Sequence, residues 1–220
     1  MRGSGMTVNS YQTEAESEGP ASESRSEILA AAARLISRRG YHAVSITDIS
    51  QAVGLSKATI YHHFSSKEQI LATIIEGTLR RLNQHIRTRL NDCSTPEDAL
   101  IAFVTSQAEF FEANIADFAV TIARTEGIEA PEQQEAINQL RTEYESMLEV
   151  VITDGIVSGC FRPFEADVIE RAVLALVYWL GRWYRPGGRH TATHIASDHV
   201  ILLLQGLKST PDNSDRPKNP

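Results

Sequence analysis

The stretch from Ser45 to Glu68, SITDISQAVGLSKATIYHHFSSKE, constrains the fold more than any other part of this chain. Ser45 and Ser65 are each followed three residues later by an acidic residue, which is the spacing of a capping box at a helix start. Ser56 comes just after Gly54 and can cap a further helix of about two turns. The stretch therefore predicts two short helices joined by a tight glycine turn, with a longer helix after them.

Apolar residues recur at helical spacing through most of the remaining chain, and neither a long strand pattern nor an internal repeat is present. Ser24 with Glu27 has capping-box spacing at the start of a first helix, which Gly40 ends. A long helix in the second half is expected to end at Gly155 or Gly159. The expected helices run from Ser24 to Gly40, from Ile46 to Val53, from Ser56 over about two turns, from Ser65 to Leu90, from Pro96, from Ile115 to Thr125, from Pro131, from Ala166 to Tyr184 and from Thr193 to Leu207.

The balance of charge differs between the N-terminal region and the rest of the chain. The whole sequence has a formal charge of −7, but residues 25–67 hold six basic and two acidic residues, a net of +4. The rest of the chain therefore carries −11. Such a split is expected when a module that binds an anionic partner is joined to a body with another role.

The remaining composition excludes several classes of protein. Cys93 and Cys160 lie far apart and support neither a disulfide framework nor a zinc knuckle. The longest apolar stretch, residues 172–180, is too short to cross a bilayer, so a cytoplasmic protein without a membrane partner is expected. Residues 1–23 and 210–220 are polar and are expected to be disordered tails. No cofactor is expected.

Two short helices joined by a glycine turn and braced by a third form a helix-turn-helix, whose second helix enters the major groove of DNA. Ile60 and Phe64 are four residues apart and can face inward with Leu55, which leaves the start of this helix outward. Small or flexible residues there let the backbone approach base edges, and polar side chains further along can reach phosphates. Hydroxyl-bearing helix starts, and the lysine that begins the fourth helix, can also attract phosphate. The candidate DNA contacts are Ser45, Thr47, Ser56, Lys57, Ala58, Thr59, Tyr61, His62, His63 and Lys67.

Each of these residues also has a simpler interpretation. Serine and threonine at helix starts are caps in most proteins, and single lysines are mostly solvated surface charges. An unrelated three-helix module is therefore the alternative. The turn glycine, the inward apolar pair, the polar tip and the basic surround occur together in one window, and this combination favours DNA binding.

The run SITDISQAVGLSKATIYHHFSSKEQIL resembles the N-terminal DNA-binding segment of the TetR family of one-component repressors. The resemblance covers Arg25 to about Leu79 and implies that the candidate residues above contact DNA, although His62 stands at a position that varies in the family. It further implies an all-α homodimer that binds palindromic operators and whose C-terminal domain binds an inducer. Residues 24–70 are thus expected to form a helix-turn-helix domain, and residues 71–209 a larger helical ligand-binding and dimerisation domain.

Two C-terminal segments are the candidates for a dimer interface. A single helix-turn-helix reads few base pairs, whereas a dimer reads two half-sites. Residues 171–184, RAVLALVYWLGRWY, and residues 199–207, HVILLLQGL, are apolar around most of a helix and must be covered on all sides. Each is expected to pack against its symmetry mate, although both could equally be core helices.

Aromatic residues are frequent in the C-terminal region, where most are expected to fill the core. A ligand pocket would add polar groups that converge on an apolar wall. Arg182 interrupts an otherwise apolar helix and needs an anion, a carbonyl or solvent. The candidate ligand-binding residues are Phe110, Phe111, Asn114, Tyr144, Met147, Tyr178 and Arg182.

The runs GCFRPFEADVIERAV and GRWYRPGG resemble the C-terminal domain of a TetR subgroup that responds to acyl-CoA thioesters, including repressors of fatty-acid and steroid-ring catabolism. This resemblance implies that Arg182 and Arg185 face CoA phosphates while an apolar tunnel holds the acyl group. Leu174 departs from relatives that have a polar or basic residue there. The predicted function is a ligand-responsive repressor released by a small apolar or acyl-CoA-like inducer.

Two other classes of function are compatible with parts of the sequence. His190 and His194 have the i, i+4 spacing that can chelate a metal, but no HExxH, GxSxG, Walker or GxGxxG element is present, so an enzyme is not expected. A scaffolding helical dimer would leave the basic N-terminal window unexplained.

Overall fold

The computed structural model of the protein describes residues 20–122 and 131–207, which form helices joined by turns and loops. The all-α prediction is confirmed for this part of the chain. The predicted tails lie outside the described residues, except that residues 20–23 form the first turn of a helix. The helices are α1 (Pro20–Arg39), α2 (Ile46–Val53), α3 (Lys57–His63), α4 (Lys67–Leu90), α5 (Pro96–Ala113), α6 (Ile115–Ile122), α7 (Pro131–Val157), α8 (Ala166–Trp183) and α9 (Ala192–Leu207).

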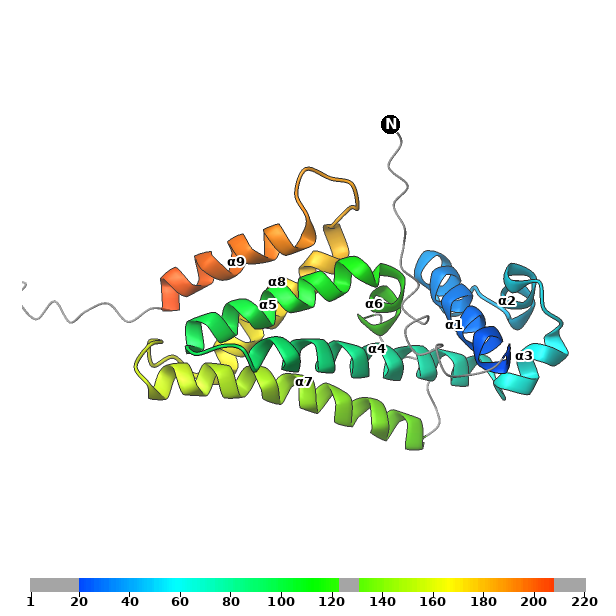
Figure 1. Cartoon of the computed structure of the whole chain (residues 1–220), viewed down its shortest axis with the longest axis horizontal. Coiled ribbons are helices and arrows are strands. Elements are labelled where there is room, and N and C mark those ends of the chain that lie inside the picture. Colours follow the sequence, from blue (N-terminus) through cyan, green and yellow to red (C-terminus); the bar gives the residue numbers. More distant parts are fainter. Residues whose placement is uncertain (1–19, 123–130, 208–220) are drawn as a thin grey trace, which may run out of the picture.

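The molecule is elongated, with a small head at one end and a larger body at the other (Figure 1). The head consists of α1 to α3, and the body of α5 and α7 to α9. Helix α4 runs from the head into the body, where it packs against α5 and α7, and α5 also packs against α9. Helix α6 lies beside α1 and α4, at the junction of head and body (Figure 1).

The described residues form two hydrophobic cores, and α4 contributes its first part to one core and its second part to the other. The head core includes Ile60 and Phe64 and continues along α4 to Leu79, whereas the body core begins on the same helix at Leu82. The predicted domain boundary after residue 70 therefore falls inside a continuous helix and inside the head core. Helix α4 thus belongs to both cores.

Helix α6 also joins the two cores. Phe118 lies in the body core, and Val120 lies in the head core. The same helix is tied to α4 by an ion pair, in which Nη2 of Arg81 lies 3.0 Å from a carboxylate oxygen of Asp117. Helix α6 is thus held by the head and by the body at once.

Local signals predicted several helix ends correctly. Ser45 caps α2 in a complete capping box with Asp48, and Gly54 ends α2 in the left-handed conformation with φ 70°. Ser56 caps α3, where its side chain accepts a hydrogen bond from the N–H of Thr59. Glycine is suited to the end of α2 because it has no Cβ to oppose a positive φ.

Two other predicted capping boxes are wrong. Helix α1 begins at Pro20, so Ser24 lies inside the helix. Proline suits a first helical turn because its N–H is not needed there and its φ is already helical. Helix α4 is capped by Ser66 instead of Ser65: the Ser66 hydroxyl accepts the N–H of Gln69 at 3.1 Å, while the Gln69 side-chain oxygen accepts the N–H of Ser65 at 2.6 Å.

Of the two glycines expected to end α7, Gly159 is the one that follows the helix, with φ 76°. Gly155 is buried inside the helix instead. Helix α6 ends among the described residues at Ile122, and the predicted end at Thr125 lies outside them.

Candidate DNA-binding head and ligand-binding body

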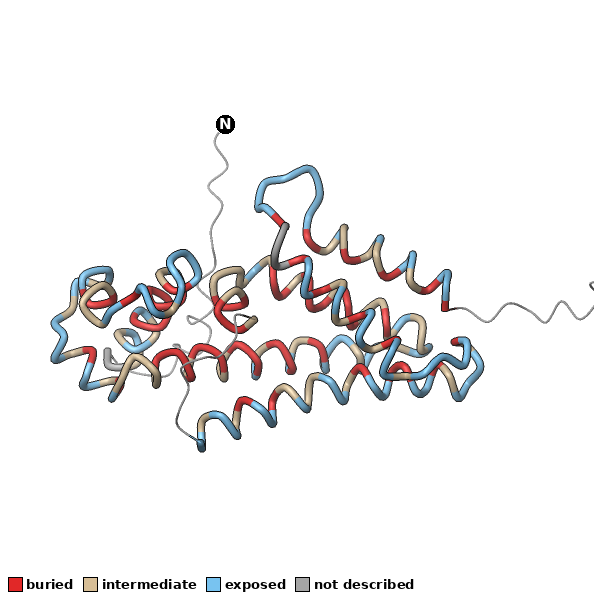
Figure 2. Tube along the Cα trace, turned by 180° about the vertical axis from the view of Figure 1, so that it is seen from behind, coloured by how far each residue is buried: buried red, intermediate tan, exposed pale blue. Residues whose placement is uncertain are grey.

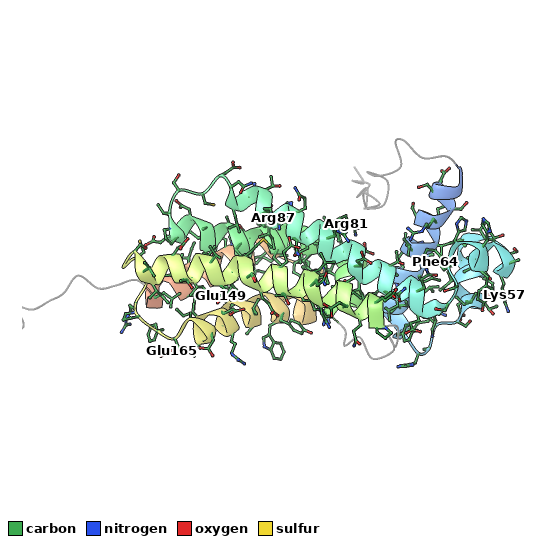
Figure 3. The ribbon with its side chains drawn as sticks, turned by 90° about the horizontal axis from the view of Figure 1, so that it is seen from below. Lys57, Phe64, Arg81, Arg87, Glu149 and Glu165 are labelled. Atoms are coloured by element: carbon green, nitrogen blue, oxygen red, sulfur yellow. The ribbon has the colours of Figure 1, made fainter. Side chains whose placement is uncertain are left out.

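Helix α3 presents its first residues to solvent at the outer end of the head. Ile60 and Phe64 are only 0 % and 1 % exposed and anchor the inner side of this segment in the head core. Lys57 and Ala58 are exposed, and Tyr61 is 54 % exposed. Figure 3 shows Lys57 at the end of the molecule and Phe64 nearer to α4. The predicted outward orientation of the tip is confirmed.

The other predicted contacts of α3 differ in exposure. His62 is exposed, whereas Thr59 and His63 are half-buried. The rings of His62 and His63 lie edge to face, with centroids 5.4 Å apart. The Ser56 and Thr59 hydroxyls are hydrogen-bonded to each other at 2.9 Å, and the Ser56 oxygen also accepts the N–H of Thr59 at 3.0 Å. Both hydroxyls thus act at the helix start, and their contact with DNA stays a prediction.

The start of α2 is held by reciprocal hydrogen bonds. The N–H of Ser45 donates to the Asp48 carboxylate at 2.8 Å, and the N–H of Asp48 donates to the Ser45 hydroxyl oxygen at 3.2 Å. Hydrogen bonding from the Ser45 side chain, and then from its backbone, lowers the pKa of Asp48 below its usual value. This carboxylate partly neutralises the positive end of the helix, so phosphate binding by Ser45 and half-buried Thr47 would depend on cations nearby.

Two exposed cations that were not among the predicted DNA contacts lie in the last turn of α1, and one of them, Arg39, lies near the start of α2. Arg38 and Arg39 are exposed, and Nη1 of Arg39 lies 3.5 Å from a carboxylate oxygen of Asp48. The adjacent arginines before Gly40 were the signal that could have marked them.

Lys67 has a different environment from the other predicted DNA contacts. Its ammonium donates hydrogen bonds to the backbone carbonyl oxygens of Tyr41 (2.9 Å) and Val44 (2.8 Å). The Nζ atom also lies 4.1 Å from the centre of the Tyr41 ring. The charge that the sequence assigns to a phosphate is thus bound within the head, and a DNA contact by Lys67 stays a prediction.

Several predicted ligand-binding residues lie in the packed interior of the body. Phe111 packs edge to face against Phe118 and Tyr184, with ring centroids 5.2 Å and 5.6 Å apart. Tyr144 packs against Phe103 at 5.2 Å. These are the contacts of a filled aromatic core, as the sequence predicts for most of these side chains.

Buried polar groups lie among these aromatic residues. The hydroxyl of Tyr144 donates to the side-chain oxygen of Gln107, and burial raises the pKa of Tyr144. The side-chain N–H groups of Asn83 and Asn114 donate to backbone carbonyls of α7 and α5 at 2.9 Å and 2.8 Å. Their amide oxygens are buried and have no hydrogen-bond partner among the described residues. A buried acceptor of this kind is satisfied by a water or by a ligand that donates a hydrogen bond.

A basic groove of about 780 Å³ runs along α4 in the body. Arg80, Arg81 and Arg87 line it, together with Asn83 and, from α5, Phe110. Figure 3 shows Arg81 and Arg87 along this helix. Each of the three arginines already has an acidic partner, so the groove is not a free cationic site.

A second groove of about 580 Å³ lies at the far end of α4, between the start of α5 and the second half of α7, and Met147 lines it. The predicted ligand-binding residues therefore do not meet in either groove. Phe110 borders the first and Met147 the second, and neither is lined by Phe111, Asn114, Tyr144 or Tyr178.

Tyr178 connects α8 to α6. Its side chain is 58 % exposed, yet its hydroxyl donates to the backbone carbonyl of Ile122 at 2.6 Å. The side chain of Arg182 lies outside the described residues, so its predicted ligand contact is not tested.

Helices α8 and α9 each bury one face in the body core and leave apolar residues exposed on another. On α8, Val168, Tyr178 and Trp179 are each 58 % exposed. On α9, Leu202 is 66 % and Ile201 44 % exposed. In Figure 2, exposed residues recur along both helices between buried ones. The core-helix alternative is confirmed for one face of each helix, and an interface on the exposed face stays a prediction.

The histidines considered for a metal site lie close together. The rings of His190 and His194 stack with centroids 4.7 Å apart, and Nε2 of His194 lies 3.4 Å from the Asp198 carboxylate. Within residues 20–122 and 131–207, however, no group of three or more His, Cys, Asp or Glu side chains is arranged to hold a metal ion. In the same part of the chain, no helix combines the length and the apolar character needed to span a bilayer.

Comparison with known proteins places this architecture in a family. Residues 28–74 match the profile of bacterial regulatory proteins of the tetR family, and residues 93–207 match that of the tetracyclin repressor-like C-terminal domain. The chain belongs to the TetR family of transcriptional regulators. The first match contains α2 and α3, and the second contains α5 to α9. The predicted division of this TetR protein into an N-terminal helix-turn-helix segment and a TetR-type C-terminal domain therefore agrees with both matches.

Relatives of this TetR protein include the HTH-type transcriptional repressor KstR2 of Rhodococcus jostii (strain RHA1), which is 30 % identical over 186 residues, 84 % of this chain and 91 % of KstR2. The structure of PfmR from Thermus thermophilus has a TM-score of 0.77 at 36 % identity and covers 83 % of this chain and 99 % of PfmR. AibR in complex with isovaleryl coenzyme A and operator DNA has a TM-score of 0.73 at 28 % identity, covering 81 % and 96 % of the two chains. The predicted likeness to acyl-CoA-responsive TetR proteins is confirmed.

Proposed function

We propose that this protein is a ligand-responsive repressor that binds a palindromic operator as a homodimer. The observation that carries the proposal is the exposed tip of α3, which stands at the outer end of the head on two buried anchors, Ile60 and Phe64. A recognition helix held in this way can place its first residues against base edges in the major groove. The proposed direct DNA contacts are Ser45, Thr47, Ser56, Lys57, Ala58, Thr59, Tyr61, His62 and His63, all within a DNA-binding unit of residues 24–70. Lys67 belongs to the same unit, but its ammonium is bound to carbonyl oxygens of the head.

The side chains of the tip have distinct proposed roles. Lys57 is an exposed cation that can donate to guanine acceptors or to a phosphate. The small side chain of Ala58 lets the helix approach the base edges. Tyr61 is further along and can donate its hydroxyl to a phosphate beside the groove.

Dimerisation is proposed through the exposed faces of α8 and α9. A C2 interface would pair each face with its own copy and remove residues such as Trp179 and Leu202 from water. The gain from burying this apolar surface is the driving force. Two heads held in this way would read half-sites separated by about 34–36 Å or a multiple of that distance.

The proposed inducer is a small apolar or acyl-CoA-like molecule bound in the unit of residues 71–209. Support comes from AibR, whose structure holds isovaleryl coenzyme A, and from the apolar interior of the body with its unsatisfied amide oxygens. The proposed ligand-binding residues are Phe110, Phe111, Asn114, Tyr144, Met147, Tyr178 and Arg182.

Helices α4 and α6 are the proposed route from ligand to DNA. Helix α4 is continuous from the head core to the body core, and α6 contributes to both. A ligand that favours one position of these helices favours one separation of the two heads. It changes operator affinity only by the ratio of its affinities for the two states.

DNA binding is tested by fluorescence anisotropy with a palindromic operator. Affinity should fall steeply with salt, because cations of the head displace counterions from phosphates. Lys57→Ala should reduce the preference for operator over unrelated DNA. The matched control is Arg89→Ala, which removes an exposed cation from the last turn of α4, at the far end of the body. If Lys57→Ala and Arg89→Ala behave alike, the assignment of α3 is wrong.

Inducer binding is tested by thermal unfolding with a series of acyl-CoA esters, with free CoA and the corresponding free acids as controls. A ligand that binds only the folded state raises the melting temperature by mass action. The same ligand should weaken operator binding in the anisotropy assay. An ester that stabilises the protein without changing operator affinity would not be the inducer.

The site of action is proposed to be the cytoplasm, because the proposed partner is operator DNA, and no cofactor or catalytic step is proposed. The competing enzyme hypothesis rests on His190 and His194. Metal analysis of the purified protein, with His194→Ala as the control, tests it directly.

A further inference from the structure

The first residue of α4 is bound to the loop that precedes α2. Lys67 reaches back to Tyr41 and Val44, the two ends of the turn between α1 and α2, and donates a hydrogen bond to the backbone carbonyl of each, at 2.9 Å and 2.8 Å. The Val44 N–H also donates to the Tyr41 carbonyl, at 3.3 Å. The lysine side chain therefore bridges the two ends of this turn.

The positive charge of Lys67 lies at the start of a helix, where it needs acceptors that compensate for the partial positive charge of the free N–H groups. A cation in the first turn of a helix is disfavoured, because the free N–H groups there carry partial positive charge. Two carbonyl oxygens and the face of the Tyr41 ring, 4.1 Å from Nζ, compensate for that at Lys67. An ammonium has three N–H donors, and two of them are engaged inside the head.

The turn held by Lys67 leads directly into the start of α2. Val44 is 1 % exposed and lies in the head core, and the next residue, Ser45, is the N-cap of α2. Thr47 is in the first turn of the same helix. One polar side chain thus links the first turn of α4 to the residues that lead into α2, beside the apolar packing of the head core.

We propose that Lys67 is a positioning residue that ties the start of α2, with Ser45 and Thr47, to the first turn of α4. Through this link the phosphate-facing start of α2 follows α4 when α4 moves. Lys67 then supports DNA binding by holding Ser45 and Thr47 in place, and its own charge is used within the head. The DNA part of this inference rests on the proposed function, whereas the link itself does not.

The link is tested without DNA by hydrogen exchange. Lys67→Met keeps the aliphatic stem and removes the ammonium. The amides of Val44 and Ser45, which are hydrogen-bonded at 3.3 Å and 2.8 Å, should then exchange about tenfold faster or more, because hydrogen bonds from a charged donor stabilise the closed turn. Amides of α8 should be unchanged. The matched control is Lys57→Met, which removes an exposed lysine of the same head and should leave both amides unchanged.

Measurements of operator binding distinguish a positioning role of Lys67 from a direct contact between Lys67 and a phosphate. Each lost phosphate contact reduces the slope of log K against log salt by about 0.9. Lys67→Met should weaken binding several-fold at every salt concentration with the slope unchanged.

The wild-type protein provides a measurement that does not depend on the variant folding. In NMR spectra, the ammonium hydrogens of Lys67 should exchange with water more slowly than those of Lys57. Equal exchange rates of the two ammonium groups, unchanged Val44 and Ser45 amides in Lys67→Met, or a slope reduced by about 0.9 in that variant would each overturn the inference. If no operator is bound at all, the proposed function fails while the exchange results still decide the link.

Discussion

The ring of Phe161 lies against the α-carbon of Gly155, so closely that a methyl group on that carbon would be 2.1 Å from the nearest ring atom. Gly155 is buried within α7, and Phe161 is 1 % exposed in the loop that follows. Gly155→Ala should therefore destabilise the protein, by about 1–3 kcal/mol from overpacking. Urea unfolding followed by circular dichroism measures the change.

The control for this variant is Gly77→Ala. A methyl group at Gly77, in the middle of α4, would meet only the end of the Arg81 side chain at an ordinary 3.5 Å. This substitution should be neutral or stabilise by up to about 1 kcal/mol, because alanine is the better helix former. If both variants change stability alike, the contact with Phe161 is not what requires glycine at position 155.

The ion pair between Arg81 and Asp117 should matter more than an exposed pair. The side chains are 22 % and 6 % exposed, and the pair joins α4 to α6. Asp117→Asn should lower the stability by about 2 kcal/mol, since it removes a largely desolvated charged hydrogen bond. Glu76→Gln, which removes the exposed pair with Arg80 on α4, should cost less than about 0.5 kcal/mol. Equal losses in the two variants would show that α6 does not depend on Arg81.

Glu170 should destabilise the protein at neutral pH. Partial burial, followed by the charges of Glu145 and Glu149 on α7, raises the pKa of Glu170. A carboxyl whose pKa is higher in the folded than in the unfolded state loses stability on ionisation and regains it as the pH falls through the folded pKa. Glu170→Gln should therefore give a small increase in melting temperature at pH 7 that disappears near pH 4.

The double variant with Glu145→Gln tests the cause. Each single substitution relieves the same repulsion, so the gain of the double variant at pH 7 should be smaller than the sum of the two. Additive gains would mean that the charge of Glu145 does not raise the pKa of Glu170.

The proposed dimer should depend on the exposed face of α9. Leu202 is 66 % exposed, and Leu202→Glu should convert dimer to monomer in light scattering after size exclusion, because an unpaired carboxylate would be buried at the interface. Val150 is similarly exposed, at 58 %, but lies on α7. Val150→Glu should leave the dimer intact, and the opposite pattern would place the interface on α7.

Much of the head was predictable because its signals act within one helical turn. The Ser45 hydroxyl and the Asp48 carboxylate meet across three residues, Gly54 supplies a positive φ that other residues avoid, and Ile60 and Phe64 face the core because they are four residues apart. Such contacts depend on little beyond the neighbouring residues. One incorrect capping box arose where the adjacent residues Ser65 and Ser66 compete for the same role, and the other arose because α1 begins earlier than Ser24, at Pro20.

The amino-acid sequence by itself determined the helices, most of their caps, the outward tip of α3 and membership of the TetR family. Only the tertiary structure decided which partner each long side chain meets. Lys67 binds carbonyls 26 and 23 residues before it, and Arg81 pairs with a carboxylate 36 residues after it. Periodicity shows that α8 and α9 have apolar faces but not which face the body core covers. Those choices follow from the path that the chain takes to bury two cores, and no local propensity encodes that path.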